Sequence, residues 1–200
     1  MVDIKVEHSQ RLREKLSALS PLTDAAWYAM RHHFSYCELD VGNTFVRTGE
    51  QATQVGFLLT GSLREYFTTA DGADYNKAFL LSGDITGSLY DLLLDQASIA
   101  TIEAIKPSSL LVANYNAFEK LYDQFDCCQR LGRVIAENLF CHKARREYEL
   151  LTMDAAQRYA CLLSQQPSVE AHVPQYHIAS YLGITPVALS RIRKKLKSLN

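Results

Sequence analysis

The cationic side chains that could bind a polyanion gather at the end of the sequence. The last twenty residues contain no Asp or Glu and carry five cations, Arg191, Arg193, Lys194, Lys195 and Lys197. Because the whole chain has a formal net charge of -1, the remaining residues are net acidic. A basic end on an acidic body is typical of a polyanion-binding segment joined to a part with another role.

The residues around these cations are spaced as in two short helices that meet at a tight turn. Ala179 is the small residue at which two such helices approach closely, and Gly183 tolerates the left-handed backbone of a sharp turn. Thr185 then provides a helix cap, and Pro186 occupies the first helical position, where its missing N–H costs nothing. The pattern predicts a helix-turn-helix at about Gln175 to Leu196. Its predicted core consists of Ile178, Leu182, Ile184, Leu189 and Ile192.

The second helix of this motif would present a polar, basic face. Such a helix lies in the major groove of DNA, with its N-terminal half against base edges. Arg191 is the candidate for base recognition, because a guanidinium bonds guanine O6 and N7 in bidentate fashion. Lys194 and Lys195 suit phosphates. The predicted DNA-binding residues are Gln175, Tyr176, Thr185, Pro186, Val187, Ser190, Arg191, Arg193, Lys194 and Lys195.

Upstream of the motif, the sequence predicts helices and then strands. Up to about Glu38 we expect short helices, with Thr23 and the following Asp as a start signal. From Val41 to about Tyr115, six short segments rich in Val, Ile, Thr, Tyr and Phe follow one another. They are separated by turn signals that include Gly61-Ser62, Asp71-Gly72 and Lys106-Pro107. Many short strands at near-regular spacing predict an antiparallel barrel or jelly roll.

A long helix without proline is predicted from about Cys127 to Leu151. Its apolar residues recur at three- and four-residue steps, which indicates one apolar seam. At about 37 Å it is longer than most globular helices, and its seam can pack on a second copy or on its own barrel. We expect a second copy, contacted by Leu131, Val134, Ile135, Asn138 and His142. A shorter helix is predicted from Asp154 to about Gln165.

A jelly roll, a long helix and a terminal helix-turn-helix in this order resemble the Crp/Fnr superfamily of transcription regulators. The resemblance covers nearly the whole chain and rests on the segments RTGE, LLTGSLREY, SGDITGSL and LGITPVALSRIRKKL. It implies an α+β fold with an antiparallel jelly-roll sensor domain with flanking helices at residues 1–125. A dimerisation helix at 126–152 and a helix-turn-helix domain at 153–200 would follow. It also implies a homodimer that binds a two-fold operator in double-stranded DNA.

The segment that binds cyclic nucleotides in this superfamily is altered here. Gly87 is kept, but Ser88 and Ser98 stand where the resemblance places a ribose-binding glutamate and a phosphate-binding arginine. In the long helix, Lys143 and Ala144 replace the small hydroxyl residues that touch the purine. Because a buried phosphate needs a charge-assisted partner, we predict that cyclic AMP does not bind in the usual way. An unidentified small-molecule effector would instead meet Gly87, Ser88, Leu89, Ser98 and Ile99.

The end of the sequence also differs from the superfamily pattern. There, a β-hairpin wing normally follows the helix-turn-helix, and this sequence ends just after the second helix. The resemblance therefore implies that the phosphate contacts of a wing are missing. We expect a modest DNA affinity that depends steeply on salt.

The sequence does not predict a cofactor, a metal site or a membrane contact. Its five cysteines form no CxxC pair and no Cys/His cluster of a zinc or iron–sulfur site. His32, His33 and His142 could ligate haem, but such histidines are more often core or surface residues. Because there is no signal peptide and no apolar run of about 18 to 20 residues, we expect a cytoplasmic protein.

Catalytic motifs are also missing from the sequence. It contains no nucleophile elbow, no GxxxxGK[ST] loop and no HExxH motif, so an enzyme is not expected. Two hypotheses of function follow. The leading one is a dimeric, sequence-specific DNA-binding regulator. The alternative is a small-molecule-binding sensor module whose C-terminal helices contact another protein.

Overall fold

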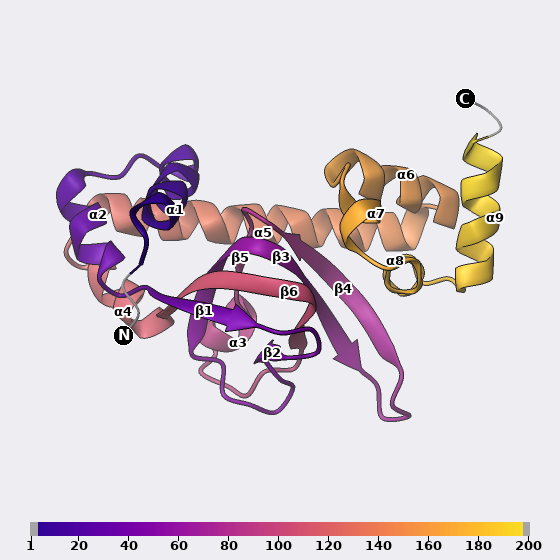
Figure 1. Ribbon diagram of the computed structural model, residues 1–200, viewed down its shortest axis with the longest axis horizontal. Helices are drawn as coiled ribbons and strands as arrows, with labels where there is room; N and C mark the ends of the chain where they lie inside the picture. The colour runs from indigo at the N-terminus through magenta and orange to yellow at the C-terminus, as the bar shows by residue number, and fades with distance from the viewer. Residues whose placement is uncertain (1–3, 198–200) are drawn as a thin grey trace.

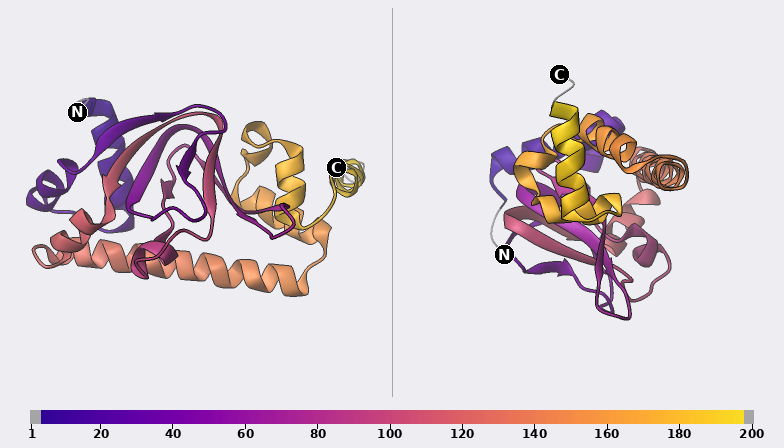
Figure 2. Two further views of the ribbon diagram at one scale, coloured as in Figure 1. Left: turned by 90° about the horizontal axis from the view of Figure 1, so that it is seen from below. Right: turned by 90° about the vertical axis from the view of Figure 1, so that its right-hand side faces the viewer.

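The computed structural model describes residues 4–197 and has an α+β architecture. A curled antiparallel sheet lies against the long helix α5 (Asp126–Thr152), which runs along one side of the molecule (Figures 1 and 2). The N-terminal helices lie at one end of α5 and the C-terminal helices at the other. The predicted α+β class and the predicted long helix are confirmed.

The N-terminal helices pack on the sheet and on α5. They are α1 (Val6–Leu19) and α2 (Asp24–Arg31), and Thr23 caps α2 by accepting a hydrogen bond from the N–H of Ala26 at 3.2 Å. The expectation of helices up to Glu38 is wrong at its end, since β1 (Ser35–Leu39) is a strand. It pairs antiparallel with the distant strand β6, a partner that no local pattern indicates.

The sheet contains six strands in the order β1-β6-β3-β4, with β2 paired to β6 and β5 paired to β3. After β1 come β2 (Thr44–Val46), β3 (Gln54–Thr68), β4 (Asp74–Leu81), β5 (Ile85–Thr86) and β6 (Thr101–Asn114). A short helix, α3 (Leu89–Leu93), lies between β5 and β6. All pairings are antiparallel, as expected for a jelly-roll type of sheet.

Two of the predicted turns bend strands instead of ending them. Gly61 lies inside β3 and Pro107 inside β6, and the β3–β6 register shifts around them. Gly61 has a φ of +91°, and a Cβ there would lie 2.5 Å from the carbonyl oxygen of Pro107. The two backbones therefore touch at this corner, and the four predicted segments form two long strands.

Five further helices complete the part of the chain that the structure describes. They are α4 (Tyr115–Tyr122), α6 (Ala155–Gln165), α7 (Val169–His172), α8 (Gln175–Leu182) and α9 (Pro186–Lys197). Asp154 caps α6 in a capping box with Gln157, which confirms the predicted start. Within residues 4–197, no helix combines the length and the apolar composition that crossing a membrane requires.

The predicted seam of α5 packs partly on its own protomer. Leu131 is only 4% exposed, in a core shared with α1, α2 and the sheet, and Ile135 packs against the same core. Leu131 therefore cannot contact a partner, and the prediction is wrong for this residue. The alternative of packing on the chain's own domain holds for this half of the helix, because α1 and α4 both reach it.

The strand corner can be tested by adding one methyl group. We expect Gly61→Ala to lower the free energy of unfolding by about 3 kcal/mol or more, since it adds a clash to an unfavourable φ. Gly42→Ala is the matched control, because Gly42 also has a positive φ (+85°) but no atom within 4 Å of its would-be Cβ. It should cost about 1 kcal/mol. Urea denaturation measures both, and equal losses would contradict the close approach.

Candidate nucleic-acid interface and effector site

The turn between α8 and α9 has the geometry that the sequence predicts. Gly183 ends α8 with φ 69° and ψ 32°, in the left-handed region. No atom lies within 4 Å of its would-be Cβ, so space is not the reason for a glycine here. The positive φ is the reason, because other residues rarely adopt it. Thr185 accepts a hydrogen bond from the N–H of Ala188 at 3.2 Å, and Pro186 is the first residue of α9.

The two helices bury one face against each other and against α6. Ile178, Ala179 and Leu182 have no exposed area, and Leu189 is 1% exposed. Ile184 and Ile192 pack against them. The predicted core of the helix-turn-helix is therefore present in the structure.

The opposite face of the motif is exposed. At the end of the molecule away from the N-terminal helices, α9 forms the outer edge (Figure 1). Nine of the ten residues predicted for DNA binding are exposed: Gln175, Tyr176, Thr185, Pro186, Val187, Ser190, Arg191, Lys194 and Lys195. We call this set the α8–α9 face.

Arg193 is the exception among the predicted DNA-binding residues. Its side chain is 25% exposed, and its Nε lies 2.8 Å from a carboxylate oxygen of Glu170 in α7. The same carboxylate accepts a hydrogen bond from the hydroxyl of Tyr159 in α6 at 2.6 Å. Burial and this hydrogen bond raise the pKa of Tyr159 to about 12. Arg193 thus ties α9 to α6 and α7, and it does not belong to the exposed face.

The first helix of the motif is docked on strand β4. The Nδ2 of Asn76 donates to the carbonyl oxygen of His177 at 3.1 Å, and the hydroxyl of Ser180 donates to that of Asp74 at 3.0 Å. Phe79 of β4 lies in the hydrophobic core of the C-terminal helices. The helix-turn-helix and the sheet therefore share one core, and the sheet sets the position of α8.

His177 is neutral in this interface. It is 7% exposed, and burial, together with the nearby Arg64, lowers its pKa to about 4. A neutral ring can accept the hydrogen bond offered to its Nδ1 by Asn76, at 3.3 Å. Because the folded pKa is below that of a free histidine, the contribution of this contact is present above about pH 6.5 and is lost as the pH falls towards 4.

The altered nucleotide segment is closed around its own carboxylate. Asp91 of α3 has no exposed area, and it accepts hydrogen bonds from Ser88, from Ser98 at 3.0 Å and from Gln96 at 2.9 Å. The N–H of Ile99 donates to the same group at 3.3 Å. Burial alone would raise the pKa of Asp91, but these hydrogen bonds outweigh burial and lower it. The segment thus holds an internal anion.

The five residues predicted for the effector do not form one pocket. Ser88, Ser98 and Ile99 surround Asp91 and line neither of the two cavities described below. Leu89 lines the first cavity and Gly87 the second. The prediction of a shared pocket is wrong, because the Asp91 side chain fills the space between the two serines.

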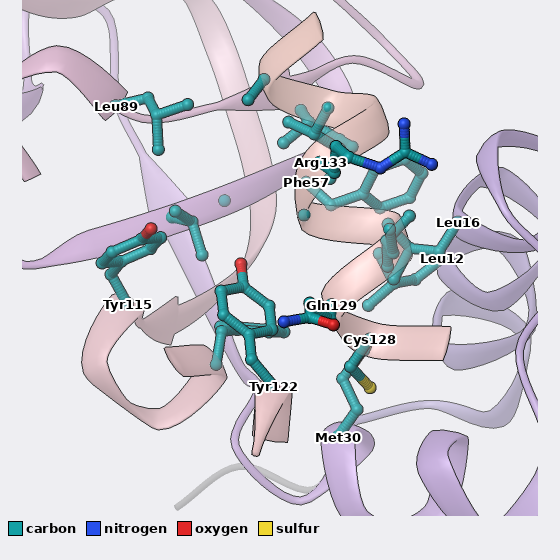
Figure 3. Close-up of a pocket in the computed structure, with 18 of the residues that line it drawn as sticks. Leu12, Leu16, Met30, Phe57, Leu89, Tyr115, Tyr122, Cys128, Gln129 and Arg133 are labelled. Carbon is teal, nitrogen blue, oxygen red and sulfur yellow. The ribbon is translucent and has the colours of Figure 1, made fainter. Parts of the chain in front are cut away.

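The first cavity is apolar and has a volume of about 380 Å³. In Figure 3, side chains of α1, α4 and α5 converge around it, among them Leu12, Leu16 and Tyr122. Burial raises the pKa of Tyr122 to about 12. Polar groups are few in its lining, and Gln129 and Arg133 of α5 are the longest of them.

The second cavity lies where the sheet, α5 and the C-terminal helices meet, and has a volume of about 290 Å³. We call it the junction cavity. Its polar lining includes Lys77 of β4, Thr86 of β5, Lys143 and Arg146 of α5, and Gln166, which follows α6. Of the residues predicted for the effector, only Gly87 lines this cavity, because the other lining residues come from distant segments of the sequence. Lys143 lies at a position where the resemblance implies a small hydroxyl residue.

The C-terminal half of α5 has a second apolar surface, which faces solvent. Phe140 is 73% exposed, Tyr148 59% and Leu151 78%. With Ala144 they are spaced by four, four and three residues, so they share one side of the helix. In the left view of Figure 2, α5 is the lower edge of the molecule. We call these four residues the α5 stripe. Of the predicted partner contacts, Asn138 and His142 are exposed as well.

The described residues contain no apparent metal-binding cluster. No group of three or more His, Cys, Asp or Glu side chains within residues 4–197 could hold a metal ion. All five cysteines are free thiols.

Comparison with known proteins identifies the sheet domain. Residues 37–125 match the family model of the cyclic nucleotide-binding domain. This match begins within β1 and ends just after α4, so it covers nearly all of the sheet and α3. A search of curated proteins found no match to the chain.

Several solved structures resemble the chain over most of its length. FixK2 from Bradyrhizobium japonicum is 22% identical, with 83% of this chain and 85% of that chain covered and a TM-score of 0.72. A CooA mutant from Carboxydothermus hydrogenoformans is 19% identical over 84% and 78%, with a TM-score of 0.65. CLP from Xanthomonas campestris, described as a c-di-GMP responsive global regulator, is 16% identical over 88% and 92%, with a TM-score of 0.66. The chain has the Crp/Fnr fold, as the sequence resemblance implied.

The internal anion can be tested by neutralising Asp91. We expect Asp91→Asn to lower the free energy of unfolding by about 2 kcal/mol at pH 7, because an amide accepts fewer hydrogen bonds than a carboxylate. A lowered folded pKa stabilises the fold above about pH 4, and this contribution is lost as the pH falls further. The difference between variant and wild type should therefore shrink from pH 6 to pH 3. A difference that does not change with pH would show that Asp91 is not ionised.

Proposed function

We propose that this chain, which carries a cyclic nucleotide-binding domain on a Crp/Fnr fold, is a homodimeric transcription regulator of the cytoplasm. It binds a specific sequence in double-stranded DNA through the α8–α9 face. The observation that carries this proposal is the division of the motif into two faces. One face packs its apolar side chains in a core, with Ile178, Ala179, Leu182 and Leu189 fully buried, and the other exposes nine residues, most of them polar or basic.

Helix α9 enters the major groove in this proposal. Its exposed residues near the start, Pro186 and Val187, contact thymine methyl groups, and Arg191 bonds a guanine edge. Lys194 and Lys195 lie further along and meet phosphates, as do Gln175 and Tyr176 at the start of α8. Arg193 takes no part, because Glu170 already pairs with it.

The α5 stripe forms the two-fold interface in this proposal. A dimer places two α9 helices on two half-sites about 34 Å apart along one face of the DNA. A row of exposed apolar side chains on a 27-residue helix supports this arrangement, because isolated apolar patches on monomers are usually small. The interface is displaced from the predicted seam, since Leu131 is buried within the protomer.

Cyclic AMP is not the effector in this proposal. Its phosphate would have to displace or face the buried carboxylate of Asp91, which already takes the hydrogen bonds of Ser88, Ser98 and the N–H of Ile99. Two anions in one buried site repel each other strongly. The domain therefore acts as a sensor of another molecule, and its role is regulatory and not enzymatic.

The alternative function is a sensor whose C-terminal helices contact a protein. One observation favours it: Tyr176 and the apolar Val187 on the α8–α9 face are 59% and 62% exposed, and tyrosine is enriched in protein interfaces. The DNA-binding experiment below separates the two functions.

Sequence selection from a random DNA library with the full chain tests DNA binding. We expect one enriched two-fold sequence, to which Arg191→Ala binds about 5- to 100-fold more weakly, the effect of losing a bidentate base contact. Arg130→Ala is the matched control, because Arg130 is exposed near the start of α5, at the end of that helix away from the C-terminal helices. Fluorescence anisotropy at several salt concentrations gives the affinities. No enriched sequence, or equal losses in both variants, would contradict DNA recognition by α9.

Sedimentation equilibrium tests the interface. We expect the wild type to be a dimer, and Phe140→Glu with Leu151→Glu to weaken it at least 100-fold, because two charges would be buried. Val41→Glu is the control, since Val41 is 60% exposed in the loop before β2. If the double variant still forms dimers at micromolar concentration, the α5 stripe is not the interface.

A further inference from the structure

Some residues that line the junction cavity have buried polar atoms without a hydrogen-bond partner among the described residues. Three buried atoms without a hydrogen-bond partner belong to residues of its lining: Oγ1 of Thr86, Nη1 of Arg146 and Oε1 of Gln166. Thr86 is 4% exposed. Because buried polar groups are almost always paired, three such atoms around one cavity indicate that it receives a polar molecule.

The charges around the cavity favour an anion. Its lining includes three strong cations, Lys77, Lys143 and Arg146, against two carboxylates, Glu65 and Asp84. Lys77 pairs with Glu65, and Asp84 accepts a hydrogen bond from the N–H of Leu81 at 2.8 Å. Within residues 4–197, Lys143 forms no ion pair.

Lys143 and Arg146 are placed to act together. They are three residues apart on α5, so they lie on the same side of the helix. Arg146 is held in position, since its Nη2 donates to the carbonyl oxygen of Tyr181 and its guanidinium lies 3.8 Å from the centre of that ring. Although much of Lys143 is exposed, burial of its ammonium and repulsion from Lys77 lower its pKa to about 8, against the attraction of Glu65.

The rest of the lining is apolar and suits the body of a small organic molecule. Phe79, Leu80, Ile102, Leu139 and Leu162 contribute to it. A volume of about 290 Å³ lies at the lower end for small-molecule sites.

We propose that the junction cavity binds a small organic anion. Its carboxylate or phosphate group lies between Lys143 and Arg146, and its apolar body packs on Phe79 and Leu162. Ser88, Ser98 and Asp91 do not line the cavity, but Gly87 and Lys143 do, so the site adjoins the altered nucleotide segment.

The location gives such an anion a route to the DNA-binding helices. The lining joins β4, α5, the end of α6 and Tyr181 of α8. Gln166 also donates from Nε2 to the carbonyl oxygen of Phe79 at 3.0 Å, across the contact between sheet and C-terminal helices. A ligand that touches both sides stabilises the docked arrangement and shifts its population. This effector role rests on the proposed function, whereas binding of the anion does not.

Calorimetry with the full chain at pH 7 tests the site, with benzoate and phenyl phosphate as probes and neutral benzamide as the control ligand. We expect saturable binding of at least one anion, and benzamide to bind at least tenfold more weakly. Binding of benzoate alone assigns a carboxylate ligand, and binding of phenyl phosphate alone assigns a phosphate. Affinity should fall from pH 7 to pH 9.5, as Lys143 loses its proton.

The variants are Lys143→Met, which removes the charge but keeps a long apolar stem, and Lys120→Met, which is the control at an exposed position of α4. Lys143→Met should weaken binding at least tenfold, and Lys120→Met should leave it unchanged. In the wild type, the bound anion should also slow acylation of Lys143, but not of Lys120, at pH 8. No saturable binding of either anion, equal binding of benzamide, or full affinity in Lys143→Met would overturn the proposal.

Anisotropy with the selected DNA separates this proposal from the proposed function. Anion binding without any DNA binding would support the cavity and contradict the regulator. DNA binding without anion binding would support the regulator and contradict the ligand site in the cavity. With both present, a saturating anion should change DNA affinity at least fivefold in the wild type and not in Lys143→Met, and no change would refute the effector role.

Discussion

The contact between helix α8 and strand β4 positions every other part of the C-terminal region. Phe79 enters the core of the helix-turn-helix, and Asn76 bonds the backbone of His177, so the sheet and the motif are packed as one body. This contact holds α9 at the outer edge of the molecule, and it places Tyr181 and Gln166 over the sheet to form the junction cavity. A change in this packing would move the α8–α9 face and reshape the cavity together.

Asp91 is the physical reason for the proposal that cyclic AMP is not the effector. A buried phosphate and a buried carboxylate both need several donors, and the donors of this segment already bond the carboxylate. The segment is thereby satisfied without a ligand. Three buried polar atoms without a partner within residues 4–197, in Thr86, Arg146 and Gln166, belong instead to residues that line the junction cavity.

Helix α5 performs two packing roles along its length. Its first half is covered by α1 and α4, and Leu131 belongs to the protomer's own core. Its second half exposes Phe140, Tyr148 and Leu151 on one side and lines the junction cavity on another. Both the proposed dimer interface and the proposed ligand site therefore lie on the same few turns of helix, so a ligand and a partner can influence each other through it.

Residues close together in the sequence determined the features that depend on local geometry. The cap at Thr185, the left-handed turn at Gly183 and the helix start at Asp154 could all be predicted, because each involves groups within a few residues. The exposed face of α9 followed from the same periodicity.

Features that depend on distant partners could not be predicted in this way. The Gly61 and Pro107 corner requires two strands to meet, and the Leu131 side of α5 is covered by helices that come much earlier in the sequence. Likewise, Arg193 resembles its basic neighbours in the sequence until Glu170 folds against it. The sequence by itself determined the helix-turn-helix and the order of elements, since caps, turns and periodicity act over a few residues. Only the tertiary structure decided which side chains remain free to bind a ligand, a partner or DNA, because burial and ion pairing depend on chain segments that only folding brings together.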